Sequence, residues 1–164
     1  MSRNQIYVGI DIGGTSIKLA FIFENGEILE KWEIPTNTEE NGKSIPQDIA
    51  NSVNTKMTSH GIMQEQLIGI GAGAPGNVDI DKGFVYEAVN IGWKNYDLKE
   101  KLKTYFDVPI IVSNDANVAA LGEHWIGAGK TVKNMIAVTL GTGVGGGIIV
   151  DDRLINGASG SGGE

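Results

Sequence analysis

Apolar and polar residues alternate near the start of the chain, with the period of two that is typical of β-strands. In the first such segment Ile6, Val8 and Ile10 occupy every second position. The dipeptide Asn25-Gly26 predicts a two-residue hairpin turn between the second and third segments. We therefore expect three antiparallel strands, at residues 6–10, 17–23 and 28–34.

The pattern then changes to a repeat of four residues, which is typical of an amphipathic helix. Ser44 and Gln47 predict a capping box at its start, and Gly61 predicts its end. The apolar residues on the buried face of this helix are Ile45, Ile49, Val53 and Met57.

Strands and helices alternate over the following residues. Strands are expected at residues 67–72 and 108–112, and Asp97 is expected to cap a helix that lies between them. A last helix follows the second of these strands. Because helices that separate strands imply parallel crossovers, we predict an α/β domain over residues 1–129. Its elements follow one another along the chain as βββαβαβα, and the five strands form one mixed sheet.

The segment after residue 130 repeats the beginning of the chain: a strand, a glycine-rich turn, a second strand and the start of a third. Aligning the two segments places Thr139 on Asp11, Gly141 on Gly13 and Gly143 on Thr15. We expect residues 130–164 to form the opening strands of a truncated second copy of the domain. A chance recurrence of a glycine-rich hairpin is the alternative.

The stretch "GIDIGGTSIK" carries a strand directly into an acidic residue, two glycines and a threonine. Gly13 and Gly14 let backbone N–H groups approach a ligand closely, Thr15 adds a hydroxyl, and Asp11 could hold a hydrated metal ion. This combination suits a nucleotide phosphate with Mg²⁺, although the same residues also form ordinary hairpin turns. Neither a dinucleotide fingerprint nor a P-loop is present.

Composition narrows the classes of function. The chain has 164 residues, of which 41% are hydrophobic, so it can bury one good core. The formal net charge is −7 and there is no basic run, which argues against sequence-independent nucleic-acid binding. The chain has no cysteine and no membrane-length apolar run, which predicts no membrane association and fits a cytoplasmic protein.

Six stretches, taken together and in this order, make the chain resemble the ROK family, and specifically its bacterial glucokinases within the actin-like and hexokinase-like ATPases. The resemblance implies an RNase H-like fold and covers the whole chain. The stretches are "GIDIGGTSIK", "GAGAPGNVD", "VNIGWKNYDL", "VSNDANVAALGE", "VTLGTGVGGGIIV" and "GASGSGGE".

The resemblance also assigns roles to individual residues. Asp115 corresponds to the catalytic base, although its position at a helix start would by itself favour a helix N-cap. Asp11 corresponds to the acidic residue that binds Mg²⁺ through water, and no zinc ligand is implied within these residues. The sugar ligands would be Gly76, Asn77, Asn114, Asp115 and Glu164; the ATP-phosphate ligands would be Asp11, Gly13, Gly14, Thr15, Gly141, Thr142 and Gly143.

The resemblance therefore implies ATP-dependent phosphorylation of a hexose 6-hydroxyl, first of all glucose to glucose 6-phosphate, with ATP and Mg²⁺. It also implies that the complete protein is a homo-oligomer and that this chain, as a fragment, could be inactive alone. The alternatives are a sugar-sensing ROK regulator and a kinase for N-acetylmannosamine, N-acetylglucosamine or fructose. Two residues keep open interpretations: Trp93 could wall the sugar site or fill the domain edge, and Lys18 could touch phosphate or remain solvated.

Overall fold

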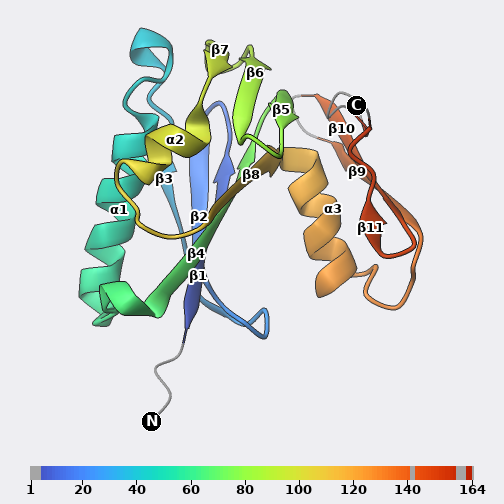
Figure 1. Cartoon of the computed structure of the whole chain (residues 1–164), viewed down its shortest axis with the longest axis horizontal. Coiled ribbons are helices and arrows are strands. Elements are labelled where there is room, and N and C mark those ends of the chain that lie inside the picture. Colours follow the sequence, from blue (N-terminus) through green and yellow to red (C-terminus); the bar gives the residue numbers. More distant parts are fainter. Residues whose placement is uncertain (1–4, 141–142, 158–161, 164) are drawn as a thin grey trace.

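A computed structural model describes residues 5–140, 143–157 and 162–163 of the chain. Its main sheet has five strands in the order β3-β2-β1-β4-β8 (Figure 1). The first three are antiparallel, whereas β1, β4 and β8 run parallel to one another, so the predicted mixed sheet is confirmed. The strands are β1 (Ile6–Ile12), β2 (Ser16–Phe23), β3 (Ile28–Pro35), β4 (Leu67–Ala74) and β8 (Ile110–Asn114).

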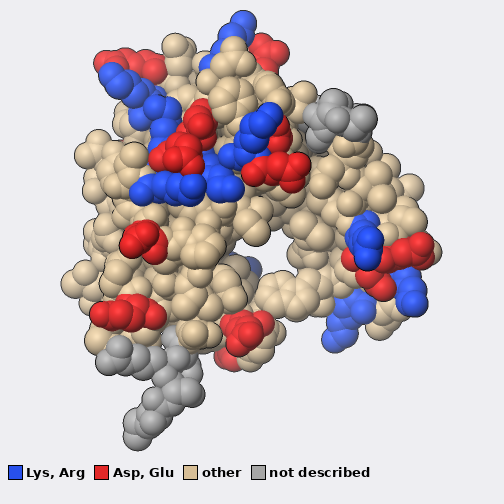
Figure 2. Space-filling view, in the orientation of Figure 1, with Lys and Arg blue, Asp and Glu red and all other residues tan. Residues whose placement is uncertain are grey.

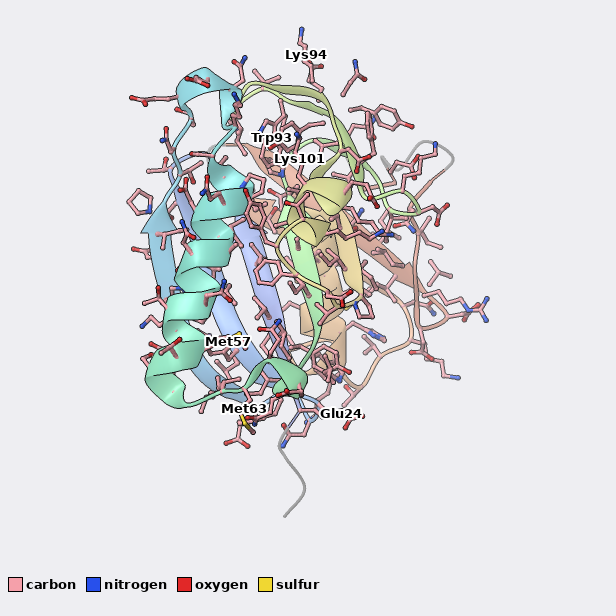
Figure 3. All side chains as sticks on the ribbon, turned by 60° about the vertical axis from the view of Figure 1, so that its left-hand side comes forward. Glu24, Met57, Met63, Trp93, Lys94 and Lys101 are labelled. Carbon is pink, nitrogen blue, oxygen red and sulfur yellow. The ribbon has the colours of Figure 1, made fainter. Side chains whose placement is uncertain are left out.

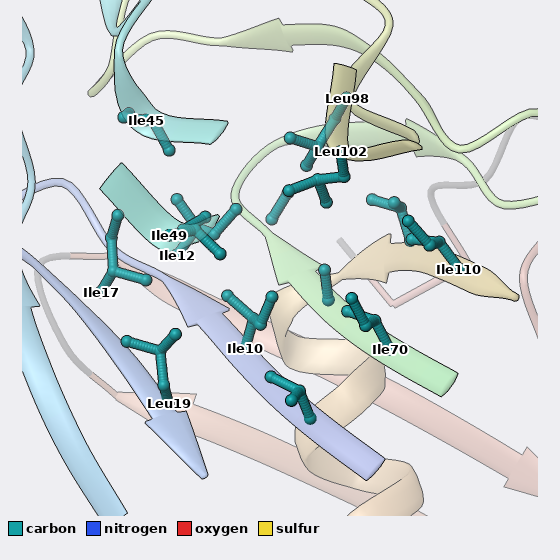
Figure 4. Packing of buried hydrophobic residues seen from close by; sticks show 14 of the residues in the cluster. Ile10, Ile12, Ile17, Leu19, Ile45, Ile49, Ile70, Leu98, Leu102 and Ile110 are labelled. Atoms are coloured by element: carbon teal, nitrogen blue, oxygen red, sulfur yellow. The ribbon is translucent and has the colours of Figure 1, made fainter. Parts of the chain in front are cut away.

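Two helices cover one face of this sheet and enclose the main core (Figures 1 and 4). They are α1 (Ile45–His60) and α2 (Leu98–Lys103), with short 3-10 turns η1 (Glu39–Asn41) and η2 (Gln64–Gln66) in the connections. Ile49 of α1 and Leu102 of α2 are fully buried with Ile12 of β1. Burying each such side chain stabilises the fold by roughly 1.5–3 kcal/mol. The apolar residues that alternate along the sequence of the strands are the ones buried in this core.

The third helix, α3 (Asp115–Trp125), starts where β8 ends and packs on a second sheet. This sheet has the order β11-β10-β9 and contains β9 (Met135–Leu140), β10 (Val144–Val150) and β11 (Arg153–Leu154). A Cβ at Gly147 would lie 2.4 Å from the Cβ of Ala120, so the glycines of β10 let the helix approach the strand closely. The expected hairpin is present, while the division of the chain at residue 129 stays a prediction.

The opposite face of the second sheet is apolar and exposed. Ile136, Val138 and Leu140 of β9 are 72%, 61% and 82% exposed, and Val144 of β10 is 76% exposed. Cross-strand pairing places Val144 beside Leu140, so these side chains form one continuous surface.

Two local predictions were wrong, and one sheet was not predicted. The Ser44 hydroxyl donates to Asp48 Oδ2 at 2.7 Å instead of capping α1. The hairpin after β2 closes between Phe23 and Glu27, so its loop is longer than two residues. A three-stranded sheet was missed altogether: β5 (Asn77–Asp79), β6 (Phe84–Ala88) and β7 (Trp93–Tyr96).

Candidate active site

The parallel strands β1, β4 and β8 bring their carboxyl ends to one edge of the main sheet. The register places Asp11 opposite Gly73, and Gly73 opposite Ser113 on the next strand. Asn114 ends β8 and Asp115 begins α3, so both follow directly from this row. The edge beyond the carboxyl ends of parallel strands is where α/β sheets commonly bind ligands.

Gly73 allows the start of α3 to sit directly on β4. A Cβ at this position would lie 3.3 Å from the Cα of Asp115 and 3.6 Å from the Cβ of Val118. Because Gly73 has no side chain, position 73 of β4 places no side chain between Asp11 on the neighbouring strand and Asp115 at the start of α3. Topology thus brings together two carboxylates that are far apart in sequence.

Asn114, and not Asp115, caps α3. The Asn114 Oδ1 atom accepts hydrogen bonds from the backbone N–H groups of Ala116 at 2.9 Å and Asn117 at 3.2 Å. Its Nδ2 atom donates to the carbonyl of Gly76 at 3.0 Å, which ties the loop after β4 to the end of β8. Asp115 is therefore not required as the helix cap.

The environment of Asp115 disfavours its ionised form. Burial is the largest cause that raises the pKa of the Asp115 carboxyl above its ordinary value, and the negative charge of Asp11 raises it further. The backbone N–H of Ala116, which donates to Asp115 Oδ1 at 2.8 Å, acts in the opposite direction. A half-buried carboxylate with a raised pKa is a stronger proton acceptor than an ordinary surface aspartate.

Hydrogen bonds from Thr36, a residue outside the turn, hold the glycine turn between β1 and β2. Within the turn, the Gly13 N–H donates to the Ser16 carbonyl at 3.0 Å. The hydroxyl of Thr36, just after β3, donates to the Gly13 carbonyl at 2.7 Å, and the Thr36 N–H donates to the Thr15 carbonyl at 3.0 Å. No local sequence signal identified Thr36, because its partner lies two strands away. Gly14 and Thr15 remain exposed at the surface of the turn.

The loop after β4 packs tightly on the small sheet. Gly76 has a φ of +81°, and a Cβ there would lie 2.0 Å from the Glu87 carbonyl oxygen. The Oδ1 atom of the next residue, Asn77, is buried and has no hydrogen-bond partner in the described part of the chain. The structure therefore places Gly76 and Asn77 beside Asn114, at the same edge as Asp11.

Two residues with open interpretations now have defined surroundings. Lys18 Nζ lies 3.7 Å from Asp11 Oδ2, and its side chain is 67% exposed. Trp93 is buried and stacks on Tyr96 with ring centroids 4.4 Å apart, while Lys94 beside it extends to solvent (Figure 3). Trp93 therefore fills the core and does not form an exposed wall.

Part of the predicted site lies outside the described residues, namely Gly141, Thr142 and Glu164. Gly143 is exposed, and a Cβ there would meet no atom within 4 Å. Within residues 5–140, 143–157 and 162–163, no three His, Asp or Glu side chains converge in a way that could hold a metal ion.

The visible surface carries mixed charge. On the face in Figure 2, Lys and Arg side chains stand next to Asp and Glu side chains, and no continuous basic area is visible. Among the helices that the structure describes, none is long and apolar enough to cross a membrane.

Comparisons with known proteins find sugar kinases and sugar repressors among the relatives. The chain is 52% identical over 158 residues to a glucokinase from Halalkalibacterium halodurans, covering 96% of this chain and 48% of that protein. The ROK family glucokinase from Streptomyces griseus, solved with glucose and AMPPNP, superposes with a TM-score of 0.82 at 35% identity, covering 97% of this chain and 49% of that one. The ROK hexokinase from Thermus thermophilus gives 0.83 at 31% identity, covering 98% and 52%.

The chain spans about half the length of the curated relatives it matches. The sequence model that describes the ROK family matches residues 7–164 of this chain. The solved relatives share the fold of the described residues. From its sequence and its fold, the chain belongs to the ROK family.

Proposed function

We propose that this chain provides the first phosphate turn, the sugar loop and the general base of an ATP-dependent hexose kinase. The observation that carries the proposal is the position of Asp115. It follows the end of β8, the capping role is taken by Asn114, and its carboxyl has a raised pKa beside Asp11. Glucose is the proposed sugar, because curated relatives at 52% and 41% identity are glucokinases.

Asp115 would act as the base in the transfer. As the sugar 6-oxygen attacks the γ-phosphorus of ATP, its O–H bond breaks and the proton passes to the Asp115 carboxylate. The new O–P bond forms while the bond from the γ-phosphorus to the bridging oxygen breaks, which releases ADP. The raised pKa of the Asp115 carboxyl favours its acceptance of that proton.

The β1–β2 turn would hold the phosphates. Gly14 and Thr15 are exposed on a turn that Thr36 fixes in place, so their backbone N–H groups are suited to phosphate oxygens. Asp11 is exposed at the strand end and fits a hydrated Mg²⁺, which when bound would neutralise phosphate charge. That Gly141, Thr142 and Gly143 form a second phosphate turn remains a prediction.

The sugar would lie against the loop after β4. Asn114 holds the Gly76 carbonyl, and Asn77 presents a buried oxygen that lacks a partner within the described chain. A sugar that displaced the atoms covering that oxygen would be able to donate a hydroxyl to it and remove the cost of leaving it unpaired. The proposed sugar contacts of Asn114 and Glu164 add to this set as predictions.

The test is sugar-dependent ADP release by the longest polypeptide that the gene encodes. Glucose, fructose, N-acetylmannosamine and N-acetylglucosamine are compared with the wild type and with Asp115→Asn. Asp107→Asn, which changes an exposed aspartate before β8, is the matched control. We expect turnover with glucose, a loss of about 10²–10⁴-fold in kcat for Asp115→Asn, and no loss for the control.

The outcomes separate the candidate functions. Turnover with another sugar would keep the reaction and change the substrate. A folded wild-type protein that binds a sugar but releases no ADP would instead support a sugar-sensing regulator. Full activity of Asp115→Asn would remove Asp115 as the base.

A further inference from the structure

The loop between β6 and β7 contacts both the proposed sugar loop after β4 and the proposed phosphate turn between β1 and β2. At one end, the backbone of Glu87 and Ala88 lies against Gly76 of the sugar loop. At the other end, Asn90 lies against the phosphate turn, because a Cβ at Gly14 would be 3.2 Å from the Cβ of Asn90. Four residues thus run from the place proposed for the sugar to the place proposed for the phosphates.

This loop is anchored on both sides of its tip. Ala88, Ile91 and Trp93 are each no more than 2% exposed. Hydrogen bonds from the Ile91 and Gly92 N–H groups to the Ala88 carbonyl, at 3.2 and 3.0 Å, close the turn. Gly92 has a φ of +84°, which a glycine adopts without strain. The loop backbone is therefore held in one conformation by its buried neighbours.

Asn90 is exposed at the tip of this anchored loop. In the described part of the chain its amide forms no hydrogen bond, so neither its donors nor its acceptor are used to stabilise the loop. An exposed asparagine is ordinary on a protein surface. Here, however, an anchored backbone holds Asn90 against Gly14 of the phosphate turn, two residues after Ala88, which lies against the sugar loop.

We propose that Asn90 is a substrate-contacting residue, whose amide donates a hydrogen bond to the phosphoryl group as it moves from ATP to the sugar. The inference rests on the proposed kinase function; Asn90 lies within the stretch "VNIGWKNYDL" but is not among the residues to which the resemblance gives a role. A neutral donor carried on an anchored backbone stabilises the charge on the equatorial oxygens of the transferring phosphoryl group, and only its side chain has to orient. Its effect should therefore be on kcat more than on the KM for the sugar.

The experiment compares Asn90→Ala and Asn90→Asp in the longest polypeptide that the gene encodes. Asn54→Ala, an exposed asparagine on α1, is the control. We expect kcat to fall about tenfold or more for Asn90→Ala, with the glucose KM within about twofold of the wild type. Asn90→Asp should lose more, because a carboxylate repels the phosphoryl oxygens although its size is unchanged.

Thermal denaturation of each variant keeps the result interpretable. If Asn90→Ala melts at a lower temperature and Asn90→Asp does not, the kcat of the isosteric Asn90→Asp variant tests the proposal. Values of kcat within about twofold of the wild type for both variants would overturn the proposal. So would equal losses that follow the loss of melting temperature, because they would indicate a structural role. A silent wild type, by contrast, would be a failure of the proposed kinase function and would remove both proposals.

Discussion

Lys18 and Asp11 stand directly opposite each other on β2 and β1, with Lys18 Nζ 3.7 Å from Asp11 Oδ2. The Asp11 carboxylate, one residue before the end of β1, thus has a positive charge on one side, while on the other side it raises the pKa of Asp115. Because the Lys18 and Asp11 side chains are 67% and 55% exposed, water screens their attraction. The pair therefore adds little to the stability of the fold.

We expect Lys18→Met to change the free energy of unfolding by no more than about 0.5 kcal/mol. Lys56→Met is the comparison, since Lys56 pairs with Glu30 at 2.5 Å, is less exposed and lies over the Trp32 ring. Chemical denaturation should show the larger loss for Lys56→Met. A loss at Lys18 as large as that at Lys56 would contradict the view that the pair at Asp11 is screened.

Asp115→Asn should stabilise the chain at neutral pH. The pKa of the Asp115 carboxyl is raised in the folded state, so folding favours its protonated form. This favourable contribution is complete below the unfolded pKa and is lost as the pH rises through the folded pKa. The melting temperature of Asp115→Asn should therefore exceed that of the wild type at pH 7, and the difference should shrink toward pH 4. A difference that grew on acidification would show that the carboxylate is stabilised by folding.

Gly73→Ala should disturb the start of α3. Its Cβ would lie 3.3 Å from the Asp115 Cα, so the helix must move by a few tenths of an ångström. We expect a loss of about 1–3 kcal/mol in unfolding free energy, as in other overpacked sites. Gly71→Ala is the matched control on the same face of β4, because a Cβ there meets no atom within 4 Å. Equal stability of the two variants would mean that α3 does not rest on Gly73.

The cap of α3 and the bond to Gly76 are roles of Asn114 that can be separated. Asn114→Ala loses both the cap of α3 and the bond to the Gly76 carbonyl, whereas Asn114→Asp keeps a capping oxygen and loses only the donor. Loss of an N-cap costs about 0.5–2 kcal/mol, so Asn114→Ala should be the less stable variant in denaturant titrations. Hydrogen exchange should show weaker protection of the first α3 amides in that variant alone. Equal protection in both variants would argue against the cap.

Long periodic segments could be predicted from the sequence, and short ones could not. The main strands and α1 carry alternating or four-residue patterns, and the structure confirms them within a few residues. Strands β5, β6 and β7 were missed because segments of three to five residues are too short to show a period. The turn at Lys82-Gly83, with Val78 and Val85 buried on its two sides, was the available signal.

Details of the site depended on structure in three dimensions. Adjacent Asn114 and Asp115 are both good capping residues, and a pattern does not locate a helix start to within one residue. Likewise, Thr36 and Asn90 contact the glycine turn from loops that are distant in the sequence. The approach of Asp11 to Asp115 follows from the β1-β4-β8 order, which local propensities do not determine.

The glycine face of β10 has a mechanical consequence. Ala116 and Ala120 of α3 rest on Gly145 and Gly147, while Val118 of the same helix rests on Gly73 of β4. The helix thus packs between the two sheets and contacts glycines of both. Any change in the spacing of the two sheets would therefore act through α3, the helix whose first residue is Asp115.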